Sequence, residues 1–182
     1  MKRPTDNLRS DHALVARGLG ALGAIAAQVR AGGTLPAADS ALLIRFLREF
    51  VIAVHLRKEA DLVCPAAAMH GSDKLAAEVG EVFRLHDEVA ELVHSLVLFW
   101  EPIDDLGDDE RRGFADTVDA VCGRLRRLAE REELALFPLC DAEVPADDQL
   151  DWLARFEALE RERTSRAEWA RRLEPALARW AR

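Results

Sequence analysis

Apolar residues recur along this chain at the three- and four-residue spacing that marks one face of an α-helix. The clearest stripe consists of Leu42, Leu43, Phe46, Phe50, Ala53 and Leu56. Strand signals, such as alternating Val, Ile and Thr or an Asn-Gly hairpin turn, are nearly absent. The pattern therefore predicts an all-α protein.

Glycine and proline divide the helical pattern into segments. We predict four long helices, over residues 9–30, 36–64, 73–100 and 108–137, with Pro65 and Pro138 expected to end the second and the fourth. Ser72 is a good N-cap for the third helix. A fifth helical region spans residues 146–182 and has a break expected near residues 164–165.

Long helices joined by short or moderate loops are typical of an up-down-up-down four-helix bundle. We therefore expect a single domain over residues 1–182, with the bundle over 9–140 and a C-terminal helical extension over 146–182. The extension is rich in large apolar residues, among them Trp152, Phe156, Trp169 and Trp180. It should lie across the bundle or form a subunit contact, which makes it a candidate surface for a homodimer.

Composition narrows the class of protein. Hydrophobic residues make up 49% of the 182 positions, and the formal net charge of -8 argues against a nucleic-acid partner. Three cysteines without paired spacing give no disulfide framework. No signal peptide is visible, and no window reaches the roughly 20 apolar residues of a membrane-spanning helix. We expect a cytoplasmic protein without a membrane partner.

Two segments near the predicted ends of the second and fourth helices look like copies of each other. Residues 55–65 read HLRKEADLVCP, and residues 128–138 read LAEREELALFP. Each segment places a glutamate, Glu59 or Glu132, six residues before its proline. The chain therefore contains an internal half-repeat.

The helices that precede these segments extend the repeat. His12 lies 43 residues before His55, and His86 lies 42 residues before Leu128. Because residues i and i+4 share one face of a helix, His55 and Glu59 can point at the same spot inside a bundle. Mixed imidazole and carboxylate ligands suit iron, and also manganese or zinc.

An isolated HxxxE pair is weak evidence, because solvated helix faces carry many such pairs. Apolar residues flank both Glu59 and Glu132, however, and a buried carboxylate without a partner is costly. A metal ion would explain two inward glutamates. The half-repeat therefore favours a metal site over a solvated face.

This arrangement resembles the hemerythrin-like (HHE cation-binding) family, which has a His on the first helix, HxxxE on the second, a His on the third and HxxxE on the fourth. The matching positions here are His12, His55 with Glu59, His86, and Leu128 with Glu132. The resemblance covers residues 9–140 and implies a bundle with one or two non-haem iron ions. One ion would take the histidines of the first two helices, the other those of the last two, with the glutamates bridging.

Leu128 departs from the family pattern, because it replaces the histidine of the fourth helix. Three outcomes follow from this departure. The second ion has an open position, or a single ion binds through His12, His55, Glu59 and Glu132, or the site is a relic. Leu128 favours the last two outcomes.

The resemblance implies a protein that binds or senses O2, NO or peroxide, for which an open coordination position is needed. One alternative is an oxidoreductase that acts on peroxide or NO at the same site. The other is a metal-depleted bundle that serves as an interaction module. Metal content separates the last from the first two, and turnover separates the first two from each other.

Overall fold

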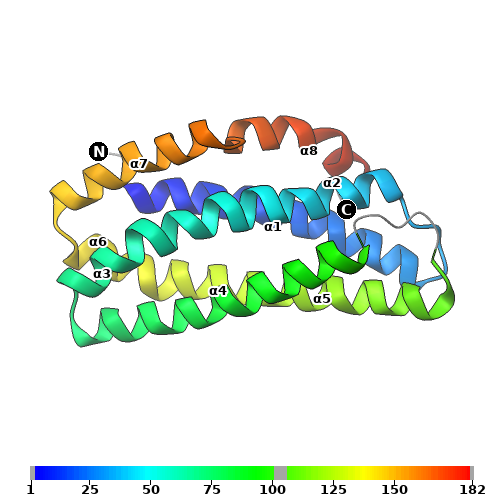
Figure 1. Ribbon diagram of the computed structural model, residues 1–182, viewed down its shortest axis with the longest axis horizontal. Helices are drawn as coiled ribbons and strands as arrows, with labels where there is room; N and C mark the ends of the chain where they lie inside the picture. Colours follow the sequence, from blue (N-terminus) through cyan, green and yellow to red (C-terminus); the bar gives the residue numbers. More distant parts are fainter. Residues whose placement is uncertain (1–2, 101–105, 181–182) are drawn as a thin grey trace.

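The computed structural model describes residues 3–100 and 106–180. Within these ranges every regular element is helical, and four long rods run antiparallel to one another as a bundle (Figure 1). The predicted all-α bundle is confirmed. Two further helices lie along its outside, so the bundle occupies the first three quarters of the chain.

Two of the four rods are single helices, and two are composite. The single helices are α1 (Pro4–Arg30) and α4 (Asp73–Trp100). The second rod joins α2 (Ala37–Phe46), η1 (Leu47–Leu56), η2 (Glu59–Val63) and α3 (Cys64–His70). The fourth joins α5 (Asp108–Arg131), η3 (Glu132–Leu136) and α6 (Phe137–Glu143). The elements named η are π-helical.

The helix starts follow from local capping. The first helix begins at Pro4, five residues before the predicted start at Arg9, because Pro4 suits the first turn and Asp6 accepts the backbone N–H of Arg3. Ser72 accepts a backbone N–H from the first turn of α4 at 3.3 Å, which confirms its predicted capping role.

The predicted helix ends at Pro65 and Pro138 are wrong. Both rods continue past the proline as α3 and α6. Each proline occupies the first turn of a new α-helical segment that follows a π-helical one, so the hydrogen-bond register changes where the proline lies. A proline is tolerated in this position because its missing N–H needs no partner there.

The π-helical turns η2 and η3, which precede the two prolines, are alike in detail. The N–H of Cys64 bonds to the carbonyl oxygen of Glu59, and the N–H of Phe137 bonds to that of Glu132, each five residues back. The half-repeat seen in the sequence is therefore a structural repeat as well. It places both glutamates at the start of a widened turn, a feature that is frequent at functional sites.

The bundle core is continuous. Phe46 stacks on Phe50 and meets the edge of Trp169, which ties the C-terminal helices to the bundle.

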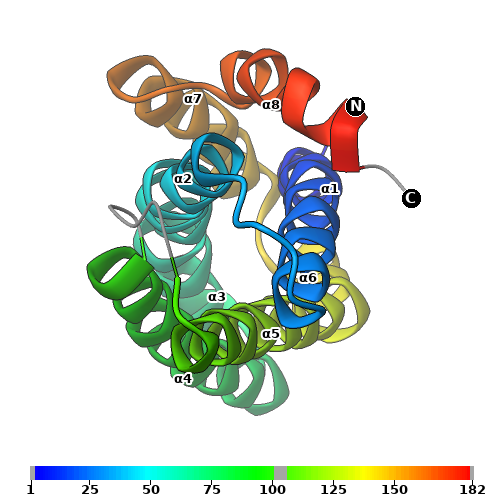
Figure 2. The same ribbon diagram turned by 90° about the vertical axis from the view of Figure 1, so that its right-hand side faces the viewer.

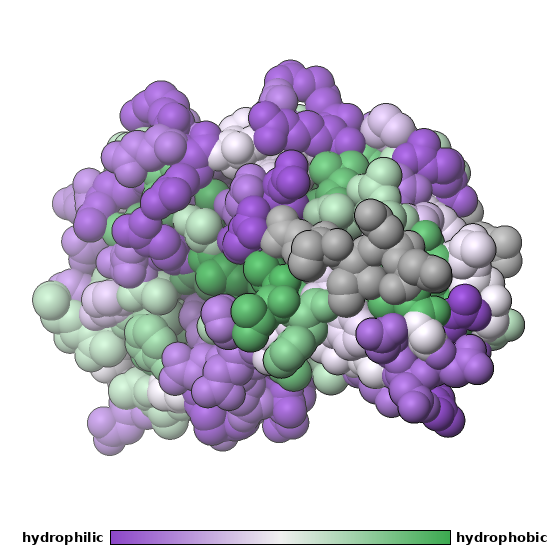
Figure 3. All heavy atoms as spheres, turned by 45° about the vertical axis from the view of Figure 1, so that its right-hand side comes forward, coloured by the Kyte–Doolittle hydropathy of each residue, from purple (hydrophilic) through white to green (hydrophobic). Residues whose placement is uncertain are grey.

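Helix α1 is long and apolar enough to cross a membrane by length and composition alone, but 56% of its most apolar window is buried inside the protein. It packs against α5 and α8, as a core helix does. Hydrophilic side chains cover much of the face in Figure 3, with a hydrophobic band across it.

The C-terminal region forms α7 (Ala146–Glu162) and α8 (Arg166–Trp180), with the break at residues 163–165 as predicted. Both helices lie lengthwise on the bundle beside α1 and α2 (Figures 1 and 2). Trp152, Phe156 and Trp169 are buried within this chain. These three rings therefore pack within a single protomer. A homodimer through this region stays a prediction.

Candidate metal centre

Five side chains predicted from the sequence come together inside the bundle, and each belongs to a different element. They are His12 on α1, His55 on η1, Glu59 on η2, His86 on α4 and Glu132 on η3. None is more than 6% exposed. The bundle thus gathers imidazoles and carboxylates from all four rods in one buried place.

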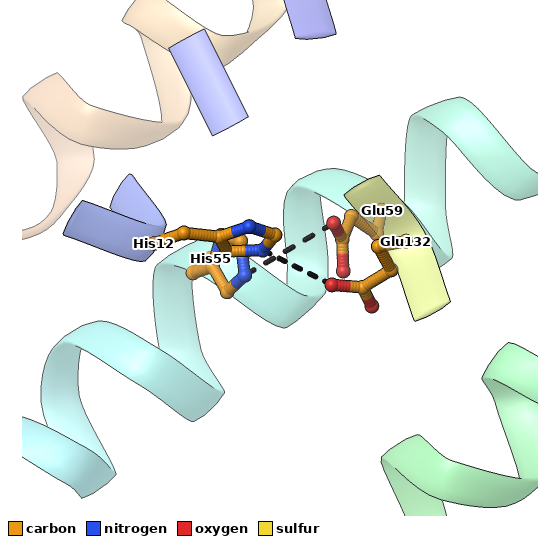
Figure 4. Close-up of side chains that lie close together, drawn as sticks. All are labelled: His12, His55, Glu59 and Glu132. Carbon is orange, nitrogen blue, oxygen red and sulfur yellow. Dashed lines mark ion pairs between the residues drawn. The ribbon is translucent and has the colours of Figure 1, made fainter. Parts of the chain in front are cut away.

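Four of these residues form the tighter group. His12, His55, Glu59 and Glu132 each offer one ligand atom, and these atoms all lie within 4.8 Å of one another (Figure 4). Nε2 of His12 lies 3.0 Å from Oε2 of Glu132, and Nε2 of His55 lies 4.0 Å from Oε1 of Glu59. This is the set that the sequence named for a single bound ion.

The fifth residue, His86, contacts the other side of both carboxylates. Its Nε2 lies 3.1 Å from Oε2 of Glu59 and 3.4 Å from Oε1 of Glu132. Each glutamate therefore turns one oxygen toward the first two histidines and the other toward His86. Leu128, one turn before Glu132, is 1% exposed and offers no donor atom to this second half.

The polar atoms that face the centre fit a cation. Nε2 of His12, Oε1 of Glu59 and Oε2 of Glu132 are buried and have no hydrogen-bond partner among the described residues. Buried polar atoms are nearly always paired, and leaving them unpaired is costly. One cation bound among them would give all three atoms a partner. The donor set therefore fits a metal ion on the geometry of the side chains alone.

Comparison with protein families gives a match to the Hemerythrin HHE cation binding domain over residues 3–140. The chain belongs to this family. No curated protein and no solved structure gave a significant match. The family assignment covers the four bundle rods and leaves α7 and α8 outside the matched range.

Protonation of the HHE site follows from burial and from its carboxylates. Burial lowers the pKa of both His12 and His86, but the nearby carboxylates, first Glu132 and then Glu59, outweigh burial and raise each pKa to about 9. Burial and repulsion from Glu132 raise the pKa of Glu59. Burial also acts to raise the pKa of Glu132, but His12 and His86 outweigh it and lower that pKa. Without metal, the two histidines carry protons that balance the glutamates.

Two further carboxylates lie beside the outer nitrogens of the HHE histidines. Oε1 of Glu133 lies 2.8 Å from Nδ1 of His12, and Oδ2 of Asp11 lies 3.4 Å from Nδ1 of His55. A carboxylate on the far nitrogen fixes the ring and its tautomer, so that Nε2 is free to bind a metal. Neither residue was predicted from the sequence, although each is adjacent in the chain to a predicted ligand.

Proposed function

We propose that this protein is a non-haem iron protein that binds or senses O2, NO or peroxide, with its principal ion held by His12, His55, Glu59 and Glu132. The observation that carries the proposal is the convergence of ligand atoms from these four buried residues, of which Nε2 of His12, Oε1 of Glu59 and Oε2 of Glu132 have no hydrogen-bond partner among the described residues. Two imidazoles with two carboxylates suit iron, with manganese or zinc as the other candidates. Bound iron would supply a redox-active centre with coordination positions that protein ligands leave free.

The second half of the site supports asymmetric loading. It holds His86 and one oxygen from each glutamate, and Leu128 replaces the remaining histidine of the family pattern. In the metal-free protein His86 lies within hydrogen-bond distance of both carboxylates and balances their charge. A second ion would gain one imidazole and two carboxylate oxygens, whereas the first ion gains two imidazoles and two carboxylate oxygens. We therefore propose that the first half fills before the second.

Burial of the centre favours a small ligand. Five surface cavities between the described residues have volumes from about 190 to 360 Å³, and the walls of these five contain none of the site residues. His12 and His86 are each only 6% exposed. A molecule that reaches the ion without moving the helices must be small, which fits a diatomic gas or peroxide and not an organic substrate.

Binding of NO to iron-loaded protein tests this proposal. Protein loaded with Fe2+ without oxygen should show a change in its visible and electron paramagnetic resonance spectra when NO is added. The His55→Ala variant, which removes one proposed ligand, should lose both the iron and the change. His94→Ala is the matched control, because His94 is exposed on α4 away from the cluster and its loss should leave the response intact. A loaded wild-type protein that gives no response to NO, O2 or peroxide would refute the small-ligand function.

A further inference from the structure

A buried network of charged side chains joins the centre to the C-terminal helices. It contains Asp11 of α1, Lys58 of the second rod, Glu160 of α7 and Arg166 of α8. The side chains of Asp11 and Lys58 are fully buried, and that of Glu160 is 18% exposed. A lysine is almost never fully buried unless it is paired. Lys58 meets this requirement, because Asp11 and Glu160 both pair with its ammonium group.

Asp11 lies at the middle of this network. Its Oδ2 accepts a hydrogen bond from Nζ of Lys58 at 2.8 Å, and its Oδ1 accepts one from Nη1 of Arg166 at 2.7 Å. Oδ2 also lies 3.4 Å from Nδ1 of His55, which has no hydrogen-bond partner among the described residues. Asp11 is therefore the carboxylate within reach of the outer nitrogen of His55, and two cations hold it in place.

The C-terminal helices complete the network from outside the family-matched range. Oε1 of Glu160 accepts a hydrogen bond from Nζ of Lys58 at 2.7 Å, and its Oε2 accepts one from the backbone N–H of Arg166 at 3.3 Å. Burial alone would raise the pKa of Asp11, but His55 and Lys58 outweigh burial and hold that pKa well below its usual range. Asp11 is thus placed as the charged partner of Lys58 and Arg166.

We propose that α7 and α8 are linked to the metal centre through Asp11, which acts as a positioning residue for His55. Docking of α8 brings Arg166 onto Asp11, and a fixed Asp11 holds the His55 ring with Nε2 turned to the metal. By thermodynamic linkage, docking then raises metal affinity, and metal binding stabilises docking by the same factor. The inference rests on the proposed metal binding and assigns the C-terminal extension a role in it.

Arg166→Gln is the test variant, because it removes one cation from Asp11 without touching a proposed ligand. Arg179→Gln is the matched control. Arg179 also joins α8 to the bundle, through a 2.9 Å hydrogen bond to Asp39 on α2, but neither residue belongs to the network around Asp11. Arg166→Lys keeps the positive charge and serves as the conservative rescue.

Co2+ binding to protein stripped of metal reports on the centre. Its affinity can be measured by competition with a chelator, and its visible ligand-field spectrum reports on the ligands. Arg166→Gln should weaken Co2+ binding by about 5-fold or more, the lower end of typical coupling between linked sites. The spectrum should change with it. Arg179→Gln should leave both unchanged, and Arg166→Lys should recover most of the affinity.

Hydrogen exchange in α8 measures the reverse effect. Co2+ should slow exchange in α8 of the wild-type protein and of Arg179→Gln, but not in Arg166→Gln. Equal loss of affinity in Arg166→Gln and Arg179→Gln, or no loss in either, would overturn the linkage while leaving metal binding in place. A wild-type protein that binds no Co2+ would overturn the proposed metal binding itself, and the linkage with it.

Discussion

Nε2 of His12 lies 3.0 Å from Oε2 of Glu132, yet neither atom has a hydrogen-bond partner among the described residues. Both side chains are buried, and both atoms face the place where Glu59 and His55 also present donors. A protonated His12 forms an ion pair with Glu132 across this distance, and a cation that replaces the proton would contact both atoms. Metal binding at this centre therefore competes with protonation of His12.

The first prediction concerns stability. Adding Fe2+ or Co2+ at about 100 times its dissociation constant should stabilise the folded protein by about 2.7 kcal/mol and raise its melting temperature by several degrees. The Glu132→Gln variant should lose this response, because it loses the charge of a proposed bridging ligand. Glu130→Gln, a change at an exposed position of the same rod, should keep it. An equal rise in both variants would place the metal elsewhere.

The second prediction concerns Leu128. Replacing it with His restores an imidazole one turn before Glu132, on the side of the centre that has only His86. The iron-to-protein ratio should rise from about one toward about two, as in bundles that hold two metal ions between carboxylates. Metal analysis of the two proteins measures this. If the wild-type protein already holds two tightly bound ions, and Leu128→His changes nothing, another ligand must complete the second half.

The third prediction concerns Glu133, whose Oε1 lies 2.8 Å from Nδ1 of His12. Glu133→Gln removes the charge that orients this ring and should weaken metal binding by about 10-fold, the usual effect of losing such an outer partner. Glu130→Gln is the control for a lost surface charge. A chelator competition assay compares them, and equal affinities would show that Glu133 has no part in positioning His12.

The fourth prediction concerns pH. The pKa of His12 and of His86 is raised from 6.5 to about 9 in the folded, metal-free protein. A raised pKa contributes stability that is complete below pH 6.5 and is lost as the pH rises through about 9. Melting temperatures of chelator-treated protein should therefore fall across this range.

Metal should reverse that trend, because bound histidines are neutral and metal binding releases their protons. The rise in melting temperature caused by micromolar Co2+ should be larger near pH 9 than near pH 6.5. A rise that is constant or shrinks with pH would mean that His12 and His86 do not carry these protons.

Part of this structure was predictable from the sequence, and the reasons are specific. Helical periodicity and the Gly breaks predicted the bundle. The half-repeat predicted the five site residues that the fold brings together. The helix ends predicted at Pro65 and Pro138 were wrong, because each proline follows a π-helical turn that lets the helix continue. Helical periodicity in the sequence does not signal such a turn.

The supporting charges were harder to predict. Lys58 reads as a solvent-exposed residue in the sequence, since Lys is rarely buried. It is 0% exposed, and its ammonium group is paired with Glu160 of α7 and Asp11 of α1. These contacts join segments 47 and 102 residues apart, so no local pattern could reveal them.

The iron content of protein purified without chelator tests the central claim most directly, measured for the wild-type chain beside His55→Ala and the control His94→Ala. If His12, His55, Glu59 and Glu132 hold the principal ion, the wild-type protein and the control should contain about one iron per chain, and His55→Ala should contain little, as expected for a centre built from facing helices. A metal-free wild-type protein that also fails to take up added Fe2+, or iron that His55→Ala retains in full, would contradict the account.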